Sequence, residues 1–149
     1  IGKITFTTIC AFLGDKLGAI GSSLILFMLL MLVDYISGML AAKKEALEHP
    51  NNNKYGWSSK KGIIGIYKKI GYIFTVLVAI TTDYLIFNMI KEIGIEYHTN
   101  TLFGLMVLVW LILNESLSIL ENAGRMGVKL PEFLVKVLAN MQKNIDDKK

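Results

Sequence analysis

The chain has 149 residues, of which 53% are hydrophobic and 19% are charged, and its formal net charge is +4. Soluble proteins carry about 25% charged residues, so this sequence has too little charge to cover a water-soluble globule, and its mean hydropathy is +0.49. The composition disfavours a disordered chain, a nucleic-acid-binding arm and a water-soluble enzyme, and it favours a membrane protein. Cys10 is the single cysteine, so an internal disulfide and a CxxC metal or haem motif are excluded. We expect no metal and no cofactor.

Residues 1–19 space their apolar side chains at helical intervals, with Asp15 and Lys16 on the opposite side. This pattern predicts an amphipathic helix on the outer membrane surface. A shallow fourth membrane segment is the alternative. Gly14, Gly18 and Gly21 recur at helical spacing, which allows either a hinge or close contact between helices.

Three long apolar blocks follow, and each contains a single charged residue. A hydrocarbon core about 30 Å thick needs about 20 helical residues to cross it. The blocks cover residues 20–42, 70–90 and 101–120, and their charged residues are Asp34, Asp83 and Glu115. The predicted fold is therefore an all-α integral membrane protein, with three transmembrane helices plus amphipathic N-terminal and C-terminal helices. A soluble helical bundle would have to hide all three blocks within a small domain.

Basic residues are distributed unevenly between the connecting segments. Of the sixteen lysines and arginines, seven lie in residues 43–69 and six in residues 121–149, but only one lies in residues 91–100. The positive-inside rule then places the N-terminus and the 91–100 loop outside, and the 43–69 loop and the C-terminal tail in the cytoplasm. We expect four lysines of the 43–69 loop to reach the lipid headgroups: Lys60, Lys61, Lys68 and Lys69.

The tail contains a second amphipathic segment. Pro131 suits the first turn of a helix, and the residues that follow place Phe133, Leu134 and Val137 on one face. We expect this helix to lie on the inner membrane surface or to pair with a partner helix.

The three acids lie on polar or small faces of their helices. An acid inside the bilayer costs about 2.5–3.5 kcal/mol on insertion scales, so each one suggests a function. The orientation above puts Asp34 and Glu115 in the inner half of the membrane and Asp83 in the outer half. The three faces comprise Asp34, Ser37, Gly38, Ala41 and Ala42; Gly71, Thr75, Ala79, Thr82 and Asp83; and Asn114, Ser118, Glu121, Asn122 and Arg125, with Glu115 beside the last group.

Two interpretations of these faces stay open. In the first, they pack the three helices of one protomer, and Lys68, Lys69 or a shared proton neutralises Asp34 or Glu115. In the second, they face other copies or a water-filled lumen after oligomerisation. A proton relay is a weaker third alternative, because both histidines lie in loops. The candidate pore or helix-packing residues are Asp34, Ser37, Gly38, Asp83, Asn114, Glu115, Ser118, Glu121 and Asn122.

Motifs for enzyme chemistry are missing from the sequence. It contains no GxSxG, HExxH, GxGxxG or Walker pattern. No Ser/His/Asp or Cys/His set can be assembled on one side of the membrane. We therefore expect no catalysis and no catalytic residue.

Several motifs together resemble the phage lysis and toxin-secretion holin family of Gram-positive bacteria and their phages. The most specific is the run Asn114–Asn122 (NESLSILEN), followed by Gly127 and Pro131. The others are DYISG at residues 34–38, SKKG at residues 59–62 leading through Gly65 to Lys68 and Lys69, and Asp83.

The resemblance implies a small protein of the bacterial cytoplasmic membrane. Such a protein accumulates in the lipid bilayer, forms homo-oligomers and at a set moment opens large lesions. The lesions let an endolysin reach the cell wall or let a toxin leave. The resemblance implies neither a nucleic-acid partner nor a catalytic residue.

Two other functions fit the residues. The basic loop and the helix after Pro131 are compatible with a membrane anchor or scaffold that docks a cytoplasmic partner. A small ion transporter using the three acids is less favoured, because transporters usually contain more spans, broken helices and inverted repeats.

Overall fold

The computed structural model describes residues 6–52, 54–96, 101–137 and 140, with only the backbone described for residues 6–17. It consists of three long helices: α1 (Phe6–Glu48), α2 (Ser59–Glu92) and α3 (Leu102–Arg125). Within these residues there is no strand. Three segments are long and apolar enough to cross a membrane: Gly18–Glu48, Ser59–Glu92 and Leu102–Arg125. The predicted all-α fold with three membrane-spanning helices is confirmed.

The helix α1 bends at Gly18. The backbone there has φ 55° and ψ −133°, which is not helical. A positive φ is accessible to glycine without steric cost, so the sequence allows a bend at this position. The predicted amphipathic face of residues 1–19 lies almost entirely in residues 1–17, whose side chains are outside the described part of the structure.

The connection between α1 and α2 is shorter than the predicted 43–69 loop. The end of α1 and the start of α2 take up most of that range and leave residues 49–58 between the helices. Pro50 and the asparagines after it stop α1, whereas Ser58 caps α2 with its Oγ, which accepts a hydrogen bond of 3.3 Å from the Lys61 amide. Lysines have good helix propensity, so the basic residues after this cap join the helix.

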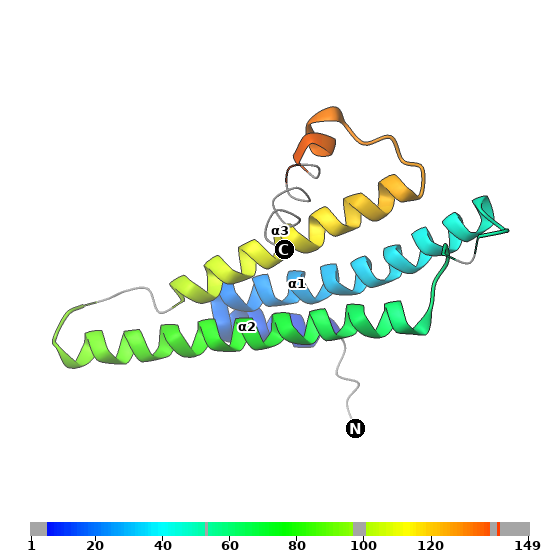
Figure 1. Cartoon of the computed structure of the whole chain (residues 1–149). Helices are drawn as coiled ribbons and strands as arrows, with labels where there is room; N and C mark the ends of the chain where they lie inside the picture. The colour runs from blue at the N-terminus through cyan, green and yellow to red at the C-terminus, as the bar shows by residue number, and fades with distance from the viewer. Residues whose placement is uncertain (1–5, 53, 97–100, 138–139, 141–149) are drawn as a thin grey trace, which may run out of the picture.

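The helices lie side by side, as Figure 1 shows. α3 contacts both other helices, and α1 and α2 contact each other least. A small core lies among them and comprises Ile20, Phe27, Met31, Val76, Leu108 and Leu111. Phe27, Leu108 and Leu111 are almost completely buried.

One end of the bundle carries most of the described basic side chains. There α1 and α3 end and α2 begins (Figure 1). We call it the basic end; it holds Lys43, Lys44, Lys60, Lys61 and Arg125. The proposed cytoplasmic side of the membrane is the side of this end.

The outer surface of the bundle is apolar. Large hydrophobic side chains are exposed along every helix, among them Leu32 on α1, Phe74 on α2 and Trp110 on α3. Contiguous apolar surface of this extent is rare on monomeric soluble proteins. The chain is therefore a multi-pass membrane protein whose outer face suits lipid or other helices.

The chain turns back after α3, as Figure 1 shows in orange. Residues 132–137 are helical, and the Pro131 carbonyl accepts hydrogen bonds from the amides of Leu134 and Val135. The predicted amphipathic helix thus begins at the expected residue. Most of its second half lies outside the described residues.

Candidate functional site: a buried polar cluster beside a basic cavity

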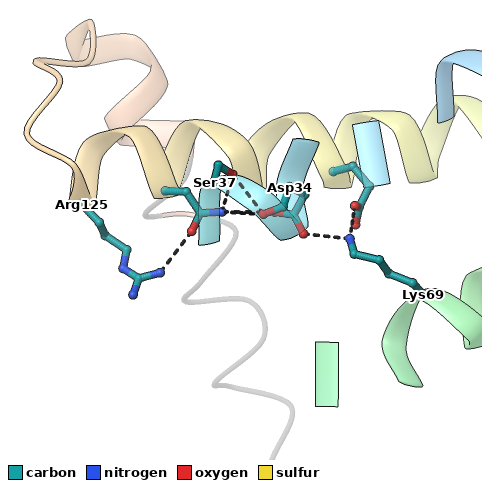
Figure 2. Close-up of polar contacts among 6 residues, drawn as sticks. Asp34, Ser37, Lys69 and Arg125 are labelled. Carbon is teal, nitrogen blue, oxygen red and sulfur yellow. Dashed lines mark hydrogen bonds and ion pairs between the residues drawn. The ribbon is translucent and has the colours of Figure 1, made fainter. Parts of the chain in front are cut away.

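Lys69 joins two acids from the other helices. Its Nζ lies 2.8 Å from Asp34 Oδ2 on α1 and 2.5 Å from Glu115 Oε2 on α3. The Lys69 and Asp34 side chains are each 15% exposed, and Glu115 is 0% exposed. Residues far apart in the chain therefore form one ion-paired group that ties the three helices together (Figure 2).

Glu115 is only partly satisfied. Its Oε1 is buried and has no hydrogen-bond partner. The group also holds two carboxyl groups against a single ammonium group. An unpaired buried polar atom costs about 1–3 kcal/mol, and more when the group is charged. In a bilayer no bulk water relieves this cost.

Asn122 extends the cluster towards the basic end. Its Nδ2 donates to Ser37 Oγ at 3.0 Å and to Asp34 Oδ1 at 3.2 Å. Its Oδ1 accepts a bond of 3.1 Å from Arg125 Nη1. Ser37 Oγ in turn donates to the Asp34 carbonyl at 3.0 Å. Figure 2 shows the continuous chain of contacts that runs from Arg125 to Lys69.

Arg125 closes the cluster at its exposed side. Its Nε and Nη2 each donate to a different Glu45 oxygen at 2.8 Å. This two-bond geometry is the strongest form of an arginine–carboxylate pair. Because both side chains are partly exposed to solvent, solvent screening weakens the attraction within this pair.

A cavity of about 250 Å³ lies beside the cluster. It is bounded by α1, α2 and α3 and by the residue before the α2 cap. Gly62 makes a close approach possible there, since a Cβ at that position would lie 3.2 Å from Tyr35 Oη and 3.1 Å from the Trp57 ring. The lining residues are Asp34, Tyr35, Gly38, Met39, Ala42, Trp57, Lys61, Gly62, Gly65, Lys68, Lys69, Ser118, Asn122 and Arg125.

Asp83 lies apart from this cluster, at the start of α3. Its Oδ1 accepts the Phe103 amide at 2.8 Å, and its Oδ2 accepts the Gly104 amide at 2.6 Å. Thr101, at the cap position, makes no side-chain cap bond. A carboxylate at a helix N-terminus satisfies free amides and the helix dipole together. Asp83 therefore caps α3 from the neighbouring helix.

The structure brings together six of the nine candidate pore or packing residues: Asp34, Ser37, Gly38, Glu115, Ser118 and Asn122. Asn114 is half-buried on α3, and Glu121 is exposed. Of the surface lysines, Lys61 and Lys68 line the cavity, Lys69 belongs to both cavity and cluster, and Lys60 is exposed outside them.

Sequence reasoning did not select Glu45, Tyr35 or Trp57 as candidate site residues, although Tyr35 lies within the DYISG motif and Trp57 suits the membrane interface. Glu45 follows Ala41 by four residues and so continues the polar face of α1, a spacing that was visible in the sequence. Tyr35 and Trp57 carry no such signal, because their proximity to Gly62 depends on how α2 lies against α1.

In the described part of the chain, no group of three or more His, Cys, Asp or Glu side chains is placed to hold a metal ion. The arrangement instead offers ion pairing between helices and a basic cavity. Neither feature requires a cofactor.

Comparisons with known proteins point to one family. The sequence profile described as the Bacteriophage holin family matches residues 11–143. An uncharacterized protein of Halalkalibacterium halodurans is 38% identical over 110 residues, which are 74% of this chain and 70% of that protein. An uncharacterized protein of Listeria innocua is 30% identical over 142 residues, covering 93% of this chain and 82% of that protein. No solved structure matches the chain. The chain therefore belongs to the bacteriophage holin family.

Proposed function

We propose that this protein is a holin that oligomerises in the bacterial cytoplasmic membrane and opens timed lesions. Through these lesions an endolysin reaches the cell wall or a toxin leaves the cell. The observation that carries the proposal is the polar cluster around Lys69, buried in a bundle whose outer face is apolar. Ionisable groups at this depth are costly in a membrane, so their presence suggests a function beyond anchoring.

The cluster supplies a physical route to a lesion. In a single copy Lys69 is ion-paired with both Asp34 and Glu115, so its one positive charge is shared between two carboxyl groups and Glu115 Oε1 stays unpaired. As copies crowd in the membrane, polar faces exchange partners between protomers. Water then enters, because carboxylates lining a lumen are better solvated than carboxylates packed against apolar side chains.

Asp34→Asn and Glu115→Gln test this route. Each variant removes one negative charge and keeps the shape of the side chain, so both proteins should still insert into the membrane while the time of lysis shifts. The protein is induced in a bacterium that holds a cytoplasmic reporter enzyme, and membrane potential and reporter release are followed. Thr81→Ala is the control, because the exposed Thr81 hydroxyl donates to the Leu77 carbonyl of its own helix and makes no hydrogen bond to another helix among the described residues.

The outcomes separate the three candidate functions. Sudden depolarisation with reporter release supports a holin, and growth without leakage supports an anchor. Ion leakage without protein release supports a transporter. Unchanged timing and unchanged oligomers in both acid variants would refute the role of the cluster in the lesion.

The proposed orientation places the N-terminus outside and the C-terminus in the cytoplasm. Thirteen of the sixteen basic residues then lie on the cytoplasmic side. Cys10 provides a direct test, since it is the single cysteine of the chain. A membrane-impermeant maleimide should label Cys10 in intact cells and should not label Lys149→Cys in a Cys10→Ser background. Labelling of Lys149→Cys without labelling of Cys10 would show the opposite topology.

A further inference from the structure

The side chains that line the cavity beside the cluster include more cations than acids. Four cationic side chains line it, Lys61, Lys68, Lys69 and Arg125, against one acidic side chain, Asp34. Lys69 is paired with Asp34 and Glu115, and Arg125 is paired with Glu45. With Glu115 and Glu45 included, the group still carries one net positive charge, and Lys61 and Lys68 are its cations without a carboxylate partner in the described structure.

These two lysines keep hydrogen-bond donors for a ligand. Among the residues that the structure describes, neither Nζ lies within 4.0 Å of a carboxylate oxygen. Lys61 Nζ donates to the carbonyls of Lys54 and Gly56, which uses two of its three N–H groups. Lys68 Nζ lies 5.5 Å from the centre of the Tyr72 ring, a contact with the face of the ring.

The cavity has room at its α2 side. A Cβ at Gly65 would find no atom within 4 Å. Its volume of about 250 Å³ is below the range of about 300–1,000 Å³ of drug-sized ligand pockets, which suits a headgroup fragment and not a whole amphiphile. Trp57 supplies an aromatic side chain of the kind that lies at the membrane–water interface.

Apolar surface continues from the cavity along the same two helices. Leu32 on α1 and Ile73 on α2 are exposed about one turn farther from the basic end than Tyr35 and Lys69. An amphiphile whose anionic head enters the cavity therefore finds apolar surface for its chains. A free phosphate ion would make no use of that surface.

We propose that this cavity binds the phosphate group of one anionic phospholipid, with Lys61 and Lys68 as its principal ligands. Basic pockets between transmembrane helices at the cytoplasmic surface bind such headgroups in other membrane proteins. The inference rests on the position of the chain in a bilayer and not on pore formation, so a failure of lysis leaves it unaffected.

Native mass spectrometry of the full chain in detergent micelles tests the proposal. The protein is titrated with phosphatidylglycerol, with zwitterionic phosphatidylcholine and with inorganic phosphate. We expect one tightly retained phosphatidylglycerol. The double variant Lys61→Gln/Lys68→Gln should weaken this binding about 25-fold, because each lysine close to an anionic lipid contributes about fivefold.

Two matched controls separate the cavity from general surface charge. Lys43→Gln/Lys60→Gln removes the same charge from exposed positions outside the cavity and should leave the affinity nearly unchanged. Gly65→Leu should abolish retention by filling the cavity. Gly71→Leu, at a helix position that is equally open but outside the lining, should not. Circular dichroism verifies that all variants remain helical.

Any of four results would overturn the proposal. Equal weakening by both lysine pairs would show a general attraction to the basic surface. Undiminished retention by Gly65→Leu would place the lipid elsewhere. Phosphatidylcholine bound as tightly as phosphatidylglycerol, or inorganic phosphate that displaces the lipid at equal concentration, would show that the cavity does not select an anionic phospholipid.

Discussion

Replacing Lys69 with methionine removes the one cation that holds Asp34 and Glu115. Methionine keeps most of the length of the side chain and fills the same space, so the main change is in charge. Removing one partner of a buried ion pair costs about 3–5 kcal/mol, because the other charge stays buried without compensation. Asp34 would retain its contact with Asn122, whereas Glu115 would lose its only hydrogen bond from another side chain in the described structure.

We therefore expect a loss no smaller than the lower end of that range. About 3 kcal/mol corresponds to roughly a hundredfold change in the folding equilibrium. The free energy of unfolding is measured by titrating the protein with SDS in mixed micelles, using circular dichroism and tryptophan fluorescence. Lys60→Met is the control, because it removes an exposed lysine from the same helix.

A triple variant provides the second arm of this experiment. Adding Asp34→Asn and Glu115→Gln to Lys69→Met leaves no unpaired charge, so most of the lost stability should return. If Lys69→Met unfolds at the same SDS concentration as Lys60→Met, the ion pairs do not hold the helices together. If the triple variant is no more stable than Lys69→Met, the loss arises from packing and not from uncompensated charge.

Two further substitutions test the junction between α2 and α3. Asp83→Ala should destabilise the start of α3 by about 1–2 kcal/mol, the loss of a helix cap, and hydrogen exchange of its first-turn amides should accelerate, whereas exchange in Thr81→Ala should not. Gly104→Ala should cost about 1–3 kcal/mol in SDS unfolding by overpacking, since its Cβ would lie 3.0 Å from Ile20 Cδ1. Gly71→Ala should be neutral or stabilising, because its Cβ would meet no atom within 4 Å and alanine favours helix. Equal effects of the two alanines would contradict the close approach at Gly104.

The sequence was sufficient to predict the three helices and the family to which the chain belongs. Long apolar blocks have few structural alternatives, because every backbone polar group in a bilayer needs an internal partner. The position of each acid along its helix follows from the helical rise, and its depth in the membrane stays a prediction. Rotation about that axis is harder to predict in helices that are apolar on most sides, because periodicity then marks no single buried face.

Lys68 and Lys69 show that the rotation of a helix about its axis determines which side chain reaches the buried acids. Lys68 and Lys69 were equal candidates to neutralise the buried acids, and consecutive residues on a helix point about 100° apart. The structure turns Lys69 into the cluster and leaves Lys68 over Tyr72. The packing of α2 against α3 determines which of the two lysines pairs with the acids. The same holds for Asp83, whose role as a cap depends on the path of the chain from α2 to α3.

The three membrane acids differ in how well the bundle satisfies them, and this difference locates the weak point of the bundle. Asp83 binds two backbone amides that stay in place for as long as α3 stays against α2. The Asp34 carboxylate has contacts with both Lys69 and Asn122. Glu115 is the most deeply buried of the three and has one oxygen without a partner. Because hydration lowers the free energy of an unpaired carboxylate most where burial is deepest, water entering the bundle stabilises Glu115 more than either aspartate. If the bundle opens as proposed, the helices are expected to separate first where α3 meets Lys69, and the start of α3 held by Asp83 is expected to separate last.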